Sequence, residues 1–272
     1  MNRLRDALRN DVPEVSLDVA ALELARVEFP AVDISTCLSR LDRLGEQIGS
    51  TLSGHVAGLE FIGRMNVVLF DTLGFDGNRE EYYDPRNSCL NSVLTRRLGI
   101  PITLSVRYME LGRRLCQTFH GAGLAGHFIV GYESMESGYW IDQFNRGRIL
   151  SFADCCELAK QTGGGDIRAN YAVLAPPTKR QILVRMLSNL KAMYLRESVL
   201  GKARMVLDLP IEAMPDYPED CLCRGMVHLR QSNHRAAKAD LETYLQLEPD
   251  SREREQVERQ LILIEHWKAG LN

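Results

Sequence analysis

The residues that follow position 178 repeat with a period of 34 residues, and this repeat constrains the fold more than any other feature of the sequence. Aligning residues 184–217 with residues 218–251 gives four matched positions: Tyr194 with His228, Ala203 with Ala237, Leu207 with Leu241, and Pro215 with Pro249. Small alanines let two helices approach closely, and each proline closes a unit. A period of this length predicts stacked helix pairs, with residues 251–268 as a capping helix.

This period, with its small, large and proline positions, resembles the tetratricopeptide repeat. Two units and a cap fall short of the three or more repeats that a free-standing array needs, so we expect residues 178–272 to pack on the preceding domain. Two roles are open for these helices. They could form a groove for a peptide or a partner protein, or they could buttress the domain without binding a ligand.

The sequence of residues 1–80 predicts a helical N-terminal part that packs on the core formed by the residues after it. Apolar residues recur there at three- and four-residue intervals in three segments: 16–26, 34–48 and 61–69. Residues 81–177 form the expected core, which ends at Pro176-Pro177. Short apolar runs within it predict a small antiparallel sheet: 117–122, 127–132 and 138–142. The expected fold class is therefore α+β, with an all-α region at the C-terminal end.

Cys89 stands where a helix is predicted to begin. The turn-rich residues 84–88 precede it, and Ser88 or Asn87 can cap a helix over residues 89–98. The positive end of a helix lowers the pKa of a thiol and favours the nucleophilic thiolate. The alternative is a small apolar residue that faces the core. After this helix, residues 102–116 could form a strand or a helix, and we expect a helix.

His127 and Asp142 lie on two adjacent predicted strands. If these strands pair as a hairpin, the histidine near the start of one lies close to the aspartate near the end of the other. A Cys, His, Asp set can perform acyl transfer through a thioester, with Cys89 as nucleophile, His127 as base and Asp142 as its orienting carboxylate. The alternatives are a histidine hydrogen-bonded to a backbone carbonyl and an aspartate that caps its own turn.

Four runs around these residues resemble the bacterial SirB family: 82–90, 96–105, 126–128 and 140–147. The resemblance implies a transglutaminase-like core followed by tetratricopeptide repeats, with a nucleophile at Cys89, a base at His127 and an orienting residue at Asp142. Two differences from the wider family stand out. Cys89 lies ten residues before Gly99, about one helical turn closer than is usual in the superfamily, and relatives often carry an aromatic residue at this position.

Two functions follow from this sequence. In the first, the chain is a cysteine-dependent amidase, protease or acyltransferase, its repeats recruit a protein substrate, and Tyr83, Asn87 and Trp140 line the substrate cleft. In the second, the same fold is a catalytically silent scaffold or regulatory adaptor. The short interval between Cys89 and Gly99 favours the second, and the intact trio favours the first.

Composition limits the partners. Among 272 residues, 33 basic and 36 acidic side chains give a net charge of −3, which argues against an electrostatic commitment to nucleic acid or to an anionic membrane. No signal-peptide core and no apolar run of membrane-spanning length is present, and the seven cysteines have no regular spacing. We therefore expect a cytoplasmic protein with free thiols and with no metal or other cofactor.

Overall fold

The computed structural model describes residues 1–9, 15–52, 56–132, 138–163, 165, 167, 171–215 and 217–269. The chain divides into two compact units, Met1–Met186 and Leu187–Asn272. This division falls within a long helix, Lys179–Arg196. Each unit is described separately below.

The first unit opens with helices, as the apolar spacing predicted. Their bounds are α1 (Asn2–Arg9), α2 (Leu17–Leu24), η1 (Ala25–Val27), α3 (Ile34–Gly49), α4 (Gly58–Asn66) and the π-helical η2 (Val67–Thr72). Asp33 caps α3 by accepting a hydrogen bond from the backbone N–H of Thr36. The buried residues of α3, Leu41, Gly45 and Ile48, share one face, and that face packs on the helix α6 (Pro101–Arg114).

The segment between the N-terminal helices and the sheet positions Cys89. It contains β1 (Asp76–Gly77), η3 (Pro85–Ser88), α5 (Leu90–Arg96) and β2 (Leu98–Gly99), and β1 pairs with β2 in parallel. Residues 102–116 were open between strand and helix, and the expected helix is confirmed: Pro101 takes the first turn of α6, where a missing N–H costs nothing. Every residue from Pro101 to Gly112 is buried.

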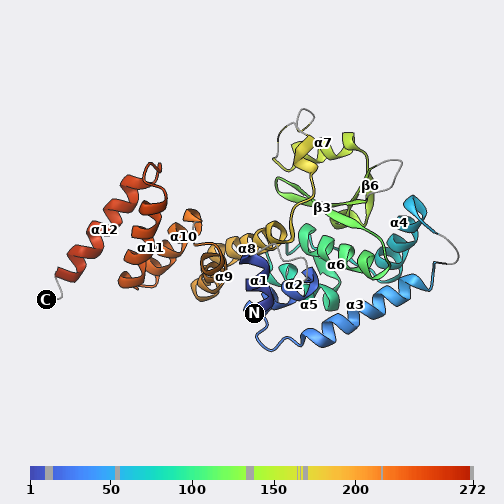
Figure 1. Ribbon diagram of the computed structural model, residues 1–272, viewed down its shortest axis with the longest axis horizontal. Coiled ribbons are helices and arrows are strands. Elements are labelled where there is room, and N and C mark those ends of the chain that lie inside the picture. Colours follow the sequence, from blue (N-terminus) through green and yellow to red (C-terminus); the bar gives the residue numbers. More distant parts are fainter. Residues whose placement is uncertain are drawn as a thin grey trace. The chain divides into compact units, whose positions relative to one another are not determined.

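A four-stranded antiparallel sheet forms the centre of the first unit. Its strands follow the chain order: β3 (Phe119–Leu124), β4 (His127–Tyr132), β5 (Tyr139–Asp142) and β6 (Arg148–Leu150). The sheet lies between α6 and the helix α7 (Phe152–Gln161), as Figure 1 shows. Side chains from α7 and from one face of the sheet form a buried cluster that includes Ile129, Trp140, Cys155 and Cys156.

The second unit contains the repeat. Its helices are α8 (Lys179–Arg196), which spans the division between the units, α9 (Leu200–Ala213), α10 (Pro218–Arg230), α11 (His234–Leu247) and α12 (Arg254–Ala269). The bounds of α9 and α11 differ by the 34 residues of the period. Ala203 and Ala237, which the repeat aligns, are both fully buried. Among the described residues, no helix is long and apolar enough to cross a membrane.

An arginine ties three helices of the second unit together. Arg224 of α10 makes two hydrogen bonds to Asp240 of α11, at 2.9 and 2.7 Å, and one to Asp208 of α9, at 2.9 Å. The hydrogen bonds and charge of Asp240 raise the pKa of Arg224. A planar guanidinium can satisfy two carboxylates at fixed angles, so this contact sets the spacing of the helices as well as their charge balance.

Candidate active site

The sheet brings His127 and Asp142 together. Imidazole Nε2 lies 2.9 Å from Asp142 Oδ1, and the two residues are 6% and 1% exposed. The pairing of Val130 with Ile141 sets this contact. If this register continues by one residue, Asp142 lies opposite Ile129. His127 is then the diagonal neighbour of Asp142 on the same face of the sheet, close enough for their side chains to meet. The hairpin geometry expected from the sequence therefore holds for this pair.

Asp142 is fixed in place by the turn that follows it. Its Oδ1 accepts the backbone N–H groups of Phe144 and Asn145, at 3.1 and 3.3 Å, and its Oδ2 accepts the Asn145 side-chain amide at 2.7 Å. Burial on its own raises the pKa of Asp142, but the hydrogen bond and charge of His127, with the Asn145 bonds, lower it below its usual value of 3.8. Asp142 is therefore a carboxylate at neutral pH.

A carboxylate on Nε2 selects the tautomer of the imidazole. Asp142 accepts a hydrogen bond from Nε2–H, so Nδ1 is the ring nitrogen with a free lone pair in the neutral form. The ring of Phe144 meets the His127 ring edge to face, with centroids 5.9 Å apart. Arg185 Nη2 donates to the backbone carbonyls of His127 and Leu124, at 2.5 and 2.7 Å, and so secures the turn between β3 and β4.

Cys89 occupies the N-cap of α5. The sequence predicted that Ser88 or Asn87 would cap this helix and that Cys89 would be its first residue; the helix instead begins at Leu90. Ser88 and Asn87 belong to the preceding 3₁₀ turn, η3, which Asp84 caps. The Cys89 side chain is fully buried, and its thiol donates to the carbonyl of Pro85 across 3.5 Å.

The three residues expected to line a substrate cleft have different surroundings. Tyr83 is 52% exposed. Asn87 is fully buried, and its side chain is used within the turn: Nδ2 donates to the carbonyl of Glu81 at 2.6 Å, and Oδ1 accepts from Asn78 at 3.1 Å. Trp140 is 6% exposed and belongs to the cluster under α7. Of the three, Tyr83 alone is open to solvent.

A row of aromatic rings connects Tyr83 with the histidine. The Tyr83 ring meets the Tyr82 ring at 5.3 Å, Tyr82 meets Phe144 at 5.9 Å, and Phe144 meets His127. All three contacts are edge to face, the arrangement that aromatic quadrupoles favour. Tyr82 and Phe144 were not predicted as site residues, although both lie in the runs that carried the family resemblance.

A second thiol lies on the α7 side of the carboxylate. Burial, followed by the charges of Cys156, Asp154 and Asp142, raises the pKa of Cys155 to about 12. Cys155 is therefore a protonated core residue at neutral pH. In the part of the chain that the structure describes, no group of three or more His, Cys, Asp or Glu side chains could hold a metal ion.

Similar proteins are known for both units. A transglutaminase-like superfamily profile matches residues 35–188, and a tetratricopeptide repeat profile matches residues 190–262. A UPF0162 protein of Xylella fastidiosa is 34% identical over 245 residues, which cover 89% of this chain and 87% of that protein. Protein SirB1 of Salmonella typhimurium is 22% identical over 273 residues and is matched over its full length. F-box only protein 21 of Homo sapiens is 29% identical over 180 residues, 62% of this chain and 28% of that protein.

Proposed function

The chain belongs to the transglutaminase-like superfamily, with SirB1 and the UPF0162 proteins as relatives, and from this membership we propose that it carries a thiol-dependent acyl-transfer site that acts on a protein or peptide. In this proposal Cys89 is the nucleophile, His127 the base and Asp142 the residue that orients the base. The observation that carries it is the buried pair of His127 Nε2 and Asp142 Oδ1 at 2.9 Å.

The chemistry follows from the tautomer. His127 Nδ1 takes the proton of the Cys89 thiol, and the thiolate attacks an amide carbonyl to form a tetrahedral intermediate. The imidazolium then returns the proton to the leaving amine as the carbon–nitrogen bond breaks, which leaves a thioester on Cys89. Water or a second amine releases the acyl group and regenerates the thiol. Asp142 stabilises the imidazolium throughout without taking up its proton.

In this proposal the helical repeats of the second unit recruit the protein or peptide substrate. Tetratricopeptide repeats stack helices into surfaces that commonly bind proteins or peptides, and the chain carries such a region over residues 190–262. The exposed Tyr83 begins the row of packed rings that ends at His127, and in this proposal these rings hold the substrate beside the imidazole. Nothing in the proposal requires nucleic acid, a membrane or a cofactor.

One observation favours the second function, a catalytically silent protein-binding scaffold. The Cys89 thiol is fully buried and donates to a backbone carbonyl, and a buried thiol in such surroundings is ordinarily inert. The two functions differ in one measurable property. A nucleophile paired with His127 ionises at a lower pH than an ordinary thiol, whereas a core cysteine does not.

Peptide-resolved alkylation with chloroacetamide between pH 5 and pH 10 tests the proposal. Cys116 is exposed and Cys89 is buried, so their absolute alkylation rates would differ because of solvent exposure alone. Each cysteine is therefore compared by the pH at the midpoint of its own rate profile. We expect Cys89 to have a midpoint below about pH 7, lower than the value of about 8.5 that is usual for a thiol. In the His127→Asn protein, the Cys89 midpoint should rise by at least one pH unit.

The same variants supply the controls. The Cys116 profile should be unchanged in His127→Asn, and circular dichroism should show that the variant is folded. Asp142→Asn should move the Cys89 midpoint upward as well, since the carboxylate fixes the tautomer. If Cys89 is not alkylated, or if its profile follows that of Cys116 in all three proteins, the scaffold function holds and the chemistry above is wrong.

A further inference from the structure

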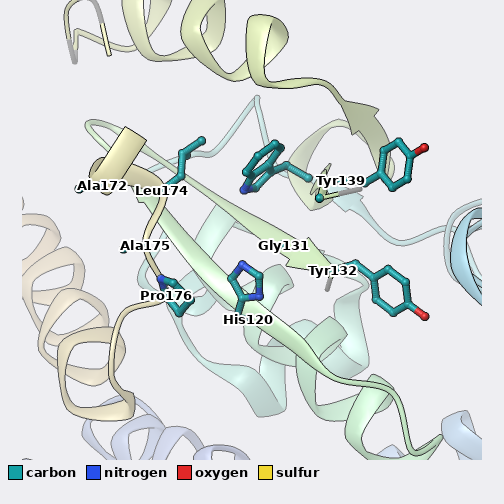
Figure 2. A pocket seen from close by; sticks show the side chains of 10 residues that line it. His120, Gly131, Tyr132, Tyr139, Ala172, Leu174, Ala175 and Pro176 are labelled. Carbon is teal, nitrogen blue, oxygen red and sulfur yellow. The ribbon is translucent and has the colours of Figure 1, made fainter. Parts of the chain in front are cut away.

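A cavity of about 350 Å³ opens on the sheet face that α7 covers, at the end of the strands away from His127. Strands β3, β4 and β5 form one side of it, and residues 172–176 form the other (Figure 2). Gly131 lies four residues from His127 along β4, about 13 Å at the usual strand rise. The fully buried Ile129 stands between them, so this cavity is separate from the proposed site.

Glycine at position 131 creates room for the wall of this cavity. Gly131 is opposite His120 in the pairing of β3 with β4. A Cβ atom at position 131 would collide with the ring of His120. The imidazole therefore lies across the strand where another residue would carry its side chain, and Figure 2 shows it between Pro176 and Gly131. His120 thus forms part of the cavity wall.

The two tyrosines at the cavity contribute mainly backbone. In Figure 2 the rings of Tyr132 and Tyr139 point away from His120 and Leu174. The Tyr132 hydroxyl is used elsewhere: it donates to Gln117 Oε1 at 2.8 Å and accepts the N–H of Gly58 at 3.3 Å. At Tyr132 and Tyr139 the strand backbone thus forms the side of the cavity, and the rings of these two residues do not fill it.

The lining defines the chemistry of a ligand. The described residues that line the cavity are His120, Gly131, Tyr132, Gly138, Tyr139, Trp140, Ala172, Leu174, Ala175 and Pro176. None of them is Lys, Arg, Asp or Glu, so a charged ligand would leave water without a counter-charge, which is costly. Aromatic and apolar groups dominate, and among the described lining residues His120 carries a ring that can both donate and accept hydrogen bonds. The volume is at the lower end of the range for small-molecule sites, about 300–1,000 Å³.

We propose that this cavity is a binding site for a small uncharged aromatic molecule with one hydrogen-bonding group, of the class of phenols and indoles. The ring of the ligand lies against the strand backbone and the Trp140 wall, and its hydroxyl or N–H group meets the His120 imidazole. The site is independent of the thiol chemistry proposed above, and no residue of the Cys89, His127 and Asp142 set takes part.

Fluorine NMR of the full chain with 4-fluorophenol tests this proposal, with 4-fluorobenzoate as a charged ligand of similar size. We expect 4-fluorophenol to shift and broaden in a saturable manner and to bind at least tenfold more tightly than 4-fluorobenzoate. Ala175→Leu fills the cavity from its exposed rim and should weaken 4-fluorophenol binding at least tenfold. Ala153→Leu, at an exposed position on α7, makes the same change outside the cavity and should leave binding unchanged.

Each result decides the proposal. Saturable binding that Ala175→Leu weakens and Ala153→Leu does not weaken supports it. If wild-type protein does not bind 4-fluorophenol, if 4-fluorobenzoate binds equally well, or if Ala175→Leu has no effect, the proposal is overturned. Should Ala175→Leu fail to fold, Ala172→Leu at the same rim takes its place, and retained binding in that variant overturns the proposal.

Discussion

Replacing Arg107 by methionine should stabilise the first unit, because this arginine is a buried charge that no described residue hydrogen-bonds. Its side chain is fully buried in α6. Among the described residues, no atom forms a hydrogen bond with any of its three guanidinium nitrogens. The guanidinium lies 4.0 Å from the ring centre of Phe75 and 5.7 Å from that of Phe70. These cation–π contacts offset part of the cost of burying the charge.

The size of the effect follows from the pKa. Burial lowers the pKa of Arg107 from 12.5 to about 9, with a smaller opposing effect from Tyr108. A change of this size costs folding roughly 5 kcal/mol at neutral pH, where the side chain is charged in both the folded and the unfolded chain. Methionine removes this cost and loses about 1–2 kcal/mol of cation–π attraction. We expect a net gain of about 3–4 kcal/mol in the free energy of unfolding.

The gain should depend on pH with a definite sign. Below about pH 9 the folded protein keeps the Arg107 proton and bears the full cost. Above pH 9 the folded protein loses this proton while the unfolded chain keeps it, so wild-type stability rises with pH. The advantage of Arg107→Met should therefore be constant between pH 6 and pH 8, and should shrink above pH 9 by about 1.4 kcal/mol per pH unit.

Urea unfolding followed by tryptophan fluorescence measures this difference. The chain has two tryptophans, and a Trp267→Phe background leaves Trp140 as a reporter within the first unit. Arg43→Met removes an exposed arginine of α3 and should change the free energy of unfolding by less than about 0.5 kcal/mol. If Arg107→Met destabilises the unit, or if its advantage does not change between pH 8 and pH 10.5, the reasoning from an uncompensated buried charge is refuted.

Two further substitutions test the sheet. Asp142→Asn should lower the free energy of unfolding by about 1–3 kcal/mol at pH 7. Because the folded pKa of Asp142 lies below 3.8, this loss should be complete above about pH 5 and should disappear as the pH falls through the folded pKa, in urea titrations from pH 7 to pH 2.5; a constant difference would contradict it. Gly131→Ala should cost about 1–3 kcal/mol because its Cβ collides with the His120 ring. In the His120→Ala background the same change should cost less than half as much, and equal costs in the double-mutant cycle would rule out that collision.

Local patterns predicted much of the architecture. The 34-residue period located the helices α9 and α11 at the correct offset, because a repeat encodes its own packing partner: Ala203 and Ala237 are small where two helices meet. The α+β class, the helical residues 102–116 and the resemblance to the SirB family are likewise confirmed. Strand β3 begins at Phe119, two residues later than predicted, and the backbone N–H of Gln117 instead donates to the Gly112 carbonyl at the end of α6.

Local sequence patterns could not predict the residues that support the site. Arg185 reaches the carbonyls of Leu124 and His127 from 61 and 58 residues away, and no spacing within α8 indicates this contact. Asn87 was expected to line the substrate cleft, but its side chain forms hydrogen bonds with Asn78 and with the Glu81 carbonyl. The direction of the Asn87 side chain depends on a turn that brings Asn78 and Asn87, nine residues apart, into contact, and no local pattern indicates this turn.

The position of Asp142 limits which thiol near it can react. A carboxylate stabilises a neighbouring imidazolium, and it destabilises a neighbouring thiolate. Asp142 accepts a hydrogen bond from His127 Nε2. Burial, then the charges of Cys156 and Asp154 and last that of Asp142, raise the pKa of Cys155 to about 12. A nucleophile that His127 activates must therefore approach the imidazole from Nδ1, the nitrogen that does not meet the carboxylate. Cys155 is a buried thiol with a pKa of about 12 and is a poor nucleophile at neutral pH, so the thiol chemistry proposed above depends on a cysteine from a different element, Cys89 at the N-cap of α5.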